Sequence, residues 1–373
     1  MTTTTPHRRV RAAAVIAIAT ALLVSAAPSA SATPPAKPTL ATWGATGAVR
    51  SQVIIGTTLY LGGSFSGMVS PDGSTTVTRR HLAAIDLVTG ALLDWSPATN
   101  GTVLAMVTDG TTIYIAGSFT TVNATSRLRL AALDTSGALT SWAPAANATV
   151  DALHLIGTTM YIGGAFTSLR GTARGYLGAV DTTTMALLDW DPEANDRVKA
   201  ITSVASGDIV VGGFFTEVGG QGIDHIDALD AITGQTESWS YPSSQEVVGL
   251  TTGPDDNVYG AIAGSGGKVR SWTNDGHLRW TVYTDGDVNA VTYYQGQVIA
   301  GGHWIYMTEG TVYLPRLAAF DPATGAPDMS WKPKPNKQPW SFATDGGSTL
   351  SVGGVFTTIS RATYRRLAVF QAP

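Results

Sequence analysis

The sequence predicts an all-β protein, and two observations carry this prediction: an unusual composition and internal repetition. Among 373 residues, 42 are Gly and none is Cys, while charged residues make up 13% and hydrophobic residues 44%. Intrinsic disorder needs lower hydrophobicity and higher net charge, and a helical bundle needs more Lys and Glu on its surface. Frequent Gly and Thr, with Val, Ala and scattered Trp, are typical of many short strands joined by tight turns.

Three motifs recur in one order and phase after residue 40. The pattern Tyr-x-Gly-Gly-x-Phe first occurs as Tyr60 to Phe65, and the pattern Leu-Ala-Ala-x-Asp first occurs as Leu82 to Asp86. Between successive copies stands a single Trp, at Trp43, Trp95, Trp142, Trp190, Trp239, Trp280 and Trp331. Compositional bias does not keep three motifs in phase, so the chain is built from repeats of one unit.

Each unit is predicted to hold four strands, a to d. Strand a begins at a Val, strand b carries the Gly pair that lets neighbouring backbones approach closely, strand c carries Leu-Ala-Ala-x-Asp, and strand d ends in the Trp. Four strands in about 48 residues is the arithmetic of a β-propeller blade. The 341 residues that follow residue 32 therefore predict seven blades. A six-bladed ring and an open solenoid are the alternatives.

The ends of the repeat predict how the propeller closes. The first copy begins in the middle of a unit, with the isolated strand-d pattern Leu40 to Trp43, and the last ends after strand c at Leu367 to Gln371. We expect the N-terminal strand to complete the last blade, which would remove exposed strand edges. The fifth unit is degenerate, since residues 265–267 stand where other units have a long loop between strands b and c.

Residues 1–32 are predicted to be a signal peptide. Three basic residues, Arg8, Arg9 and Arg11, precede an apolar run, and Ala30 and Ala32 fit the small-x-small cleavage pattern. General secretion is favoured over the twin-arginine route, and a membrane anchor is the alternative. Residues 33–39 are predicted to be a Pro-rich linker before the propeller at 40–373. We expect a secreted, extracellular or wall-associated protein with no membrane span after processing.

Charge and Cys content narrow the classes of partner. Losing the three Arg of the signal peptide would change the formal net charge from −4 to −7, because residues 1–32 hold no acidic residue. Nucleic acids and anionic membranes need a basic face, so neither is expected as a partner. The lack of Cys excludes disulfides, thiol catalysis and Cys-based metal sites.

The repeat motifs resemble those of the delta-sixty-type repeat proteins, a family of secreted bacterial propellers without an established common activity. That resemblance covers residues 40–373 and implies fold and location only. The pattern Ala84-x-Asp86 followed by Thr89-Gly90 and Trp95 also resembles the quinoprotein-like repeat, in which the Trp packs between blades. No set of cofactor residues matches that family, so we predict no quinone and no other cofactor.

A candidate ligand site emerges where strand a departs from the repeat. Two places after its first residue, every strand a carries Ser, Ala or Gly, which predicts crowding near a central channel. One place after it, size and charge vary: Arg50, Leu104, Asp151, Lys199, Val248, Asn289 and Trp340. We expect Arg50, Asp151, Lys199, Asn289 and Trp340, with His154 farther along its strand, to form a ligand site at the channel mouth. A solvated entrance without a ligand is the alternative.

Two functions follow from this pattern. The first is a binding or structural module that presents its loop face to an extracellular glycan, peptide or protein. The second is a secreted carbohydrate-active hydrolase or lyase that uses acidic residues at the channel mouth. No catalytic constellation and no metal site stands out, which favours the first. The repeated Trp residues are expected in the core between blades, and the repeated Asp of strand c is expected to bond the Thr-Gly turn that follows it.

Overall fold

The computed structural model describes residues 33–372 except 238, 240, 241, 265 and 309. The expected signal peptide, with Ala30 and Ala32, lies outside the described residues. Within them the chain is all-β, and its sheets are small and antiparallel. No helical segment of these residues has the length and apolar character that a bilayer crossing needs.

The first repeat unit forms a sheet in the order a, b, c, and six further units follow it in the described part of the chain. The strands a are β2 (Val49–Ile55), β7 (Val103–Thr108), β12 (Val150–Ile156), β17 (Val198–Ser203), β20 (Val247–Thr252), β24 (Val288–Tyr294) and β29 (Pro339–Thr344). The central strands b are β3 (Thr58–Gly63), β8 (Thr112–Gly117), β13 (Thr159–Gly164), β18 (Ile209–Gly213), β21 (Val258–Ile262), β25 (Gln297–Gly302) and β30 (Thr349–Gly354). The strands c are β6 (Leu82–Asp86), β11 (Leu130–Asp134), β16 (Leu177–Asp181), β19 (Ile226–Leu229), β22 (Lys268–Trp272), β28 (Leu317–Phe320) and β33 (Leu367–Gln371).

The predicted strand d is wrong for most units. Among the described residues, only the fifth unit has a four-stranded sheet, in which β23 (Leu278–Tyr283) pairs with β22. Elsewhere strand d is reduced to a single bridge, such as the one between Ile85 and Leu92. A Pro follows two residues after the Trp in units such as Trp95-Ser-Pro97, and Pro cannot donate to a ladder. Trp280 has no such Pro, so its strand continues.

Short hairpins lie in the connections between the end of strand b and the start of strand c. They are β4 (Gly67–Val69) with β5 (Thr76–Thr78), β9 (Thr121–Val122) with β10 (Thr125–Ser126), β14 (Ser168–Leu169) with β15 (Thr172–Ala173), β26 (Tyr306–Met307) with β27 (Val312–Tyr313), and β31 (Thr358–Ile359) with β32 (Ala362–Thr363). The short strand β1 (Gly44–Ala45) pairs with β4. In the fourth unit the described residues form only the Val218–Gln221 bridge here, and those of the fifth unit's short connection form no such hairpin.

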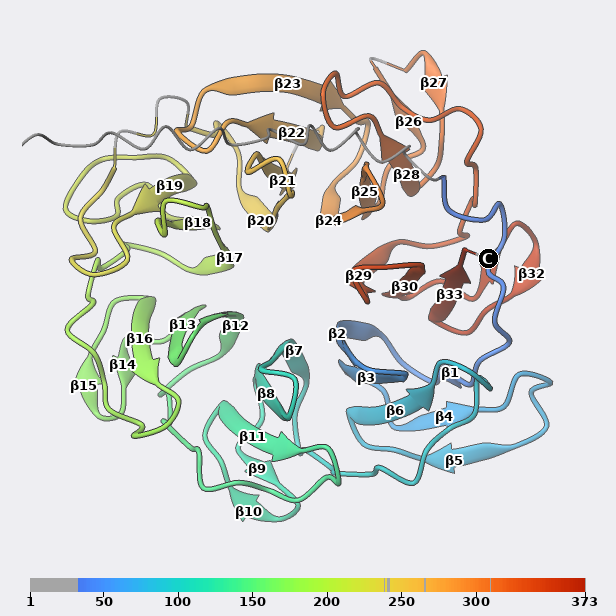
Figure 1. Cartoon of the computed structure of the whole chain (residues 1–373), viewed down its shortest axis with the longest axis horizontal. Coiled ribbons are helices and arrows are strands. Elements are labelled where there is room, and N and C mark those ends of the chain that lie inside the picture. Colours follow the sequence, from blue (N-terminus) through green and yellow to red (C-terminus); the bar gives the residue numbers. More distant parts are fainter. Residues whose placement is uncertain (1–32, 238, 240–241, 265, 309, 373) are drawn as a thin grey trace, which may run out of the picture. The chain divides into compact units, whose positions relative to one another are not determined.

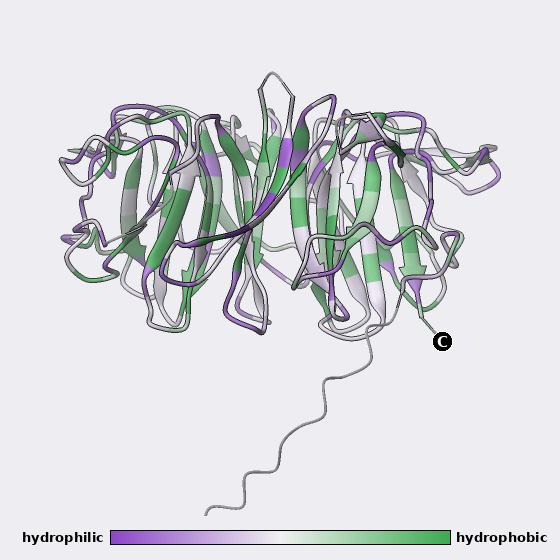
Figure 2. Ribbon diagram, turned by 90° about the horizontal axis from the view of Figure 1, so that it is seen from above, coloured by the Kyte–Doolittle hydropathy of each residue, from purple (hydrophilic) through white to green (hydrophobic). Residues whose placement is uncertain are grey.

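The core lies between neighbouring sheets, and apolar residues accordingly concentrate on the strands while the hydrophilic ones gather in the loops (Figure 2). Trp190 is 2% exposed, its ring meets Tyr161 edge-on at 5.0 Å, and its Nε1 donates to the Asp230 carbonyl of the next unit at 3.0 Å. A Cβ on Gly63 would collide with the Ala48 carbonyl oxygen, which explains the second Gly of the strand-b pattern. The prediction that the repeated Trp residues are core is confirmed from Trp95 to Trp331, which are all buried.

The repeated Asp of strand c organises the turn after it, as predicted. Asp86 Oδ1 accepts from the backbone N–H of Val88 and Thr89 and from the Thr89 hydroxyl, at 2.7 to 2.9 Å. These bonds stabilise the carboxylate and lower the pKa of Asp86. The same arrangement recurs at Asp181, Asp230 and Asp321. The residue therefore serves the turn, and no metal is needed to explain it.

The strands a face a common centre, each beside the strand a of the next unit (Figure 1). The first and last units also touch, because β2 packs against β29. Gln52 carries a buried polar network there: its Nε2 donates to the Ser341 hydroxyl oxygen at 2.9 Å, and its Oε1 accepts from Ser351 at 2.6 Å. Leu40 forms a bridge with Val369 of β33.

Candidate functional site

A β-bulge at the start of every strand a positions the candidate site. In β2 the pairing with β3 moves from Val49–Gly63 to Ser51–Gly62, so Arg50 is an extra residue without a partner in the ladder. A bulge turns a side chain away from the regular pleat. The bulged residues are those that the sequence marked as variable: Arg50, Leu104, Asp151, Lys199, Val248, Asn289 and Trp340.

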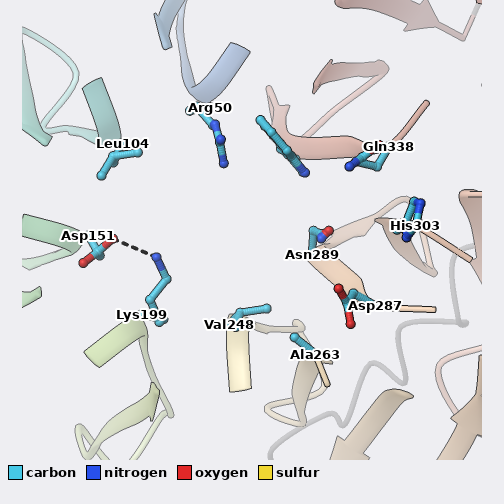
Figure 3. A pocket seen from close by; sticks show the side chains of 11 residues that line it. Arg50, Leu104, Asp151, Lys199, Val248, Ala263, Asp287, Asn289, His303 and Gln338 are labelled. Atoms are coloured by element: carbon cyan, nitrogen blue, oxygen red, sulfur yellow. Dashed lines mark hydrogen bonds and ion pairs between the residues drawn. The ribbon is translucent and has the colours of Figure 1, made fainter. Parts of the chain in front are cut away.

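All seven of these residues line one cavity of about 430 Å³, which we call the mouth pocket. Ala263, Asp287, His303 and Gln338 complete its lining (Figure 3). A second cavity is lined by all of the bulged residues except Leu104 and by small residues such as Ser51 and Ala105. The expectation that small residues lie near the centre is therefore met, and the pocket gathers one residue from each unit's bulge.

Arg50 and Trp340 form a stacked pair in this pocket. The Arg50 guanidinium carbon lies 3.2 Å from the centroid of the Trp340 ring, a cation–π arrangement. The buried Nε of Arg50 has no hydrogen-bond partner among the described residues. Burial lowers the pKa of Arg50 to about 10, which leaves the side chain charged at neutral pH. The pocket thus holds a partly buried cation that forms no ion pair with a carboxylate of the described residues.

Asp151, by contrast, is saturated by cations. Its side chain is 1% exposed, and it accepts from Arg197 Nε at 2.6 Å, Arg197 Nη2 at 2.7 Å and Lys199 Nζ at 2.7 Å. The hydrogen bonds that Arg197 donates to Asp151 raise the pKa of Arg197. This bidentate pairing is the strong form of an Arg–carboxylate contact. Asp151 therefore fixes Arg197 and Lys199 in place, and both of its oxygens are already engaged.

The opposite side of the pocket carries amides, a carboxylate and an imidazole. Figure 3 shows Asn289, Gln338, Asp287 and His303 together on this side, away from Asp151 and Lys199. Asp287 Oδ1 accepts from the Gly264 N–H at 3.0 Å. The buried Oδ1 of Asn289 has no partner among the described residues. A buried polar atom without a partner costs free energy, so this side is suited to accept a hydrogen-bond donor from a ligand.

The structure does not bring His154 to the mouth pocket. His154 Nε2 lies 2.9 Å from Ser203 Oγ, on the neighbouring β17, and His154 is not among the residues that line either central cavity. Burial lowers the pKa of His154 to about 4, so it is neutral at pH 7. His154 thus does not join the other candidates in the lining, because it lies three residues along β12 from the bulged Asp151 and contacts Ser203.

Sequence reasoning overlooked Gln338 and His303. Gln338 stands where other units have Ala48, Thr102 or Thr149, one residue before strand a. His303 follows the Gly pair of strand b, where the first unit has Ser64. Each differs from its counterparts in the repeat, so the reasoning that found Arg50 would have found both, had it been applied to the residues beside the strands.

One acidic group among the described residues could approach a metal ion. Carboxylate oxygens of Asp208, Asp230 and Glu237 lie within 4.8 Å of one another. Asp230 Oδ1 already accepts three bonds from its own turn, and Asp208 accepts from Ser206. Turn formation explains these residues, and they lie outside the mouth pocket.

Comparison with known proteins bears on the fold. No protein-family model and no curated protein matches the chain. A chain in the crystal structure of a mitotic checkpoint complex is similar, with a TM-score of 0.62 at 12% identity over 98% of this chain and 99% of that one. The designed Ika8 protein has a TM-score of 0.54 at 13% identity over 90% of this chain and 100% of its own. The checkpoint chain is a β-propeller, so the fold of this chain is propeller-like.

Proposed function

We propose that this chain is an exported, seven-bladed β-propeller that binds an extracellular ligand in the mouth pocket. The observation that carries the proposal is that all seven bulged residues, none of them kept by the repeat, line a single cavity. Positions that a fold needs are repeated in every unit, as the buried Trp residues are. Positions that vary while sharing one cavity are free to serve a ligand, and binding sites are commonly concave with a few converging polar groups.

The proposed ring closes between the last unit and the first. Three contacts support this closure: the packing of β2 on β29, the Leu40–Val369 bridge and the Gln52 network. In addition, Trp331 Nε1 donates to the Pro35 carbonyl at 3.0 Å, in the role that the Asp230 carbonyl has for Trp190. We expect deletion of residues 33–43 to lower the free energy of unfolding by several kcal/mol, measured in urea. An unchanged midpoint would favour an open solenoid.

Export rests on the N-terminal pattern of basic residues, apolar run and Ala30 and Ala32, and on the resemblance to secreted delta-sixty-type propellers. Mass spectrometry of the protein recovered from the medium of a bacterial host tests it. A mature N-terminus at Thr33 is expected, and retention of residues 1–32 in the cells would contradict export by cleavage.

Binding is favoured over hydrolysis because of the state of Asp151. A catalytic acid, base or nucleophile must reach its substrate, yet both oxygens of Asp151 are held by Arg197 and Lys199. Asp287 is the other carboxylate in the lining, and it bonds the Gly264 amide. The mouth pocket therefore offers cationic and amide groups to a ligand, and lacks a free carboxylate pair.

Glycan and peptide arrays probed with the purified protein test the proposal. We expect a ligand class that wild type retains and that Trp340→Ala loses, while Trp340→Phe keeps part of the signal. The control is Arg170→Gln, which removes an exposed cation from the hairpin of the third unit, outside the lining of the pocket. Binding that Trp340→Ala leaves unchanged would contradict a site at the mouth, and turnover lost in Asp151→Asn would favour a hydrolase.

A further inference from the structure

A further cavity, which we call the groove, adjoins the mouth pocket and is lined by residues of the sixth and seventh units. This groove has a volume of about 410 Å³ and shares His303, Gln338 and Trp340 with the mouth pocket. Its other lining residues are Arg316, Asn336, Lys337 and Val355. The two cavities thus share part of their lining, Trp340 included, and we call them together the track.

The track is locally cationic on a protein whose net charge is negative. Arg316 and Lys337 line the groove, and no carboxylate is among the described residues that line the groove itself. The mouth pocket adds two further cations, Arg50 and Lys199. Lys337 is exposed and occupies a position that is Gly in the first, second and sixth units. Two carboxylates line the mouth-pocket part of the track, and both are engaged: Asp151 accepts from Arg197 and Lys199, and Asp287 accepts from the Gly264 amide.

Aromatic residues lie on the hairpin of the sixth unit, next to the groove. Tyr306 and Tyr313 are 42% and 49% exposed, and their ring centroids are 5.5 Å apart. Lys334 Nζ lies 5.2 Å from the centroid of the Tyr313 ring. The hairpins of the second, third and seventh units carry Thr, Ser or Ala at both places. Several departures from the repeat therefore lie in the sixth and seventh units. They are Trp340, His303 and Lys337 on the track, and the Tyr pair on the hairpin of the sixth unit.

We propose, as a deepening of the proposed function, that this track binds an acidic oligosaccharide that carries carboxylate groups. The Arg50 guanidinium, held flat on Trp340, would take one carboxylate at the inner end, and Arg316 and Lys337 would take others along the groove. Asn289 and Gln338 supply amides for sugar hydroxyls, whereas the Asn336 amide already bonds Thr357 and Thr358. An acidic peptide fits less well, because the groove offers few apolar side chains for its residues to pack on.

How much each variant should weaken ligand binding follows from how exposed the removed cation is. Removing a charge-assisted hydrogen bond in a desolvated pocket weakens binding by about tenfold to a hundredfold, so Arg50→Gln should have the larger effect. Lys337 is exposed, and loss of a solvated ion pair weakens binding by about twofold to fivefold. The contribution of both cations should fall as salt is raised, since salt screens exposed charges.

Isothermal titration calorimetry on the purified full chain tests this inference, with a galacturonic acid heptamer as the acidic probe. A galactose oligomer of equal length is the neutral control, and a Glu heptapeptide is the peptide arm. We expect binding of the galacturonate alone, weakened by salt, by Arg50→Gln and by Lys337→Gln, and unchanged by Arg170→Gln. Thermal unfolding of each variant separates loss of the site from loss of the fold, and the exposed Lys337 keeps the test open if Arg50→Gln unfolds.

The outcomes distinguish the two levels of the proposal. Binding of the neutral oligomer, or of the Glu peptide in preference to galacturonate, overturns the acidic-oligosaccharide inference and leaves the mouth pocket as a binding site if Trp340→Ala abolishes that binding. If Arg170→Gln weakens galacturonate binding as much as Lys337→Gln does, the attraction is a diffuse charge effect. That result overturns the proposal that the track is the binding site. No binding of any probe, together with array signals that Trp340→Ala leaves intact, overturns both.

Discussion

Trp190 lies in a region where the units keep the same residue type, and Trp340 lies in a region where the residue type differs from unit to unit. Trp190 belongs to the packed layer between units, where its counterparts from Trp95 to Trp331 are also buried Trp residues and Trp43 is partly buried. Trp340 belongs to the mouth pocket, where its counterparts are Arg, Leu, Asp, Lys, Val and Asn. The layer needs the same shape at each boundary between units, whereas the pocket is a single place that each unit reaches with a different side chain. The comparison separates residues that hold the fold from residues that serve a ligand.

The largest expected effect is on the packed layer. Trp190→Ala removes a buried indole, its edge-on contact with Tyr161 and its bond to the Asp230 carbonyl. We expect the free energy of unfolding to fall by about 3–5 kcal/mol, the range for a large aromatic replaced by Ala in a core. Urea denaturation measures it. Trp340→Ala is the matched variant, and an equal loss there would erase the distinction between the two regions.

Asp151 tests this comparison because it is one of the variable bulged residues of the pocket, yet its side chain is buried and fully paired, as that of a structural residue is. Asp151→Asn keeps the shape and leaves Arg197 and Lys199 without their carboxylate. Both cations are partly exposed and regain some water, so we expect a loss of about 1–3 kcal/mol in the free energy of unfolding. Chemical denaturation of the variant at high and low salt checks this value. No loss of stability would mean that Asp151 is as free to serve a ligand as Arg50.

Asp227 is a departure from the repeat inside the packed layer. It is fully buried, its two carboxylate oxygens have no partner among the described residues, and other units have Ala83 or Ala131 at its place. Desolvation raises the pKa of Asp227 to about 7. The unfolded chain ionises near pH 4 while the folded chain keeps the proton, so this residue lowers stability as pH rises from about 4 to about 7.

Asp227→Ala restores the residue of the other units and leaves no new cavity relative to them. We expect it to raise the free energy of unfolding by about 1–3 kcal/mol at pH 8, the usual cost of a buried polar group without a partner. The gain should be smaller at pH 4, where the unfolded chain is itself about half protonated at this residue. Urea denaturation across this pH range measures both, and a gain that does not depend on pH would mean that Asp227 is not protonated in the folded state.

The smallest expected effect on stability is at Lys337. Its side chain is exposed and makes no hydrogen bond or ion pair in the described structure. Lys337→Gln should change the free energy of unfolding by less than about 0.5 kcal/mol, as exposed substitutions commonly do. Differential scanning calorimetry suffices to check it. A large change would place Lys337 among the residues that hold the fold.

The repeat made much of this architecture predictable, because each motif has a local cause. The Gly pair, the Asp turn and the buried Trp all do in the structure what their residue types indicate. The variable residues were identified from sequence as well, since the alignment of strands a isolates them. The predicted strand d failed because two features compete there: the Trp that packs and the Pro that ends the ladder.

What the sequence could not supply was the pairing of charges across units. Arg197 and Asp151 lie 46 residues apart and meet because Asp151 is the bulged residue of β12 and Arg197 stands directly before the neighbouring β17. The stacking of Arg50 on Trp340 joins opposite ends of the chain in the same way. His154 shows the converse, since a single hydroxyl, Ser203, decides where the ring is held. Such contacts depend on side-chain conformation after folding.

Hydrogen–deuterium exchange with the galacturonic acid heptamer most directly tests whether the variable residues are the ligand site. We predict slower exchange over residues 48–52 and 336–342, which hold Arg50, Lys337 and Trp340, and unchanged exchange over 150–156, where Asp151 is already paired. Protection confined to the turns after strands c, or protection absent from 336–342 while the probe is bound, would contradict the account.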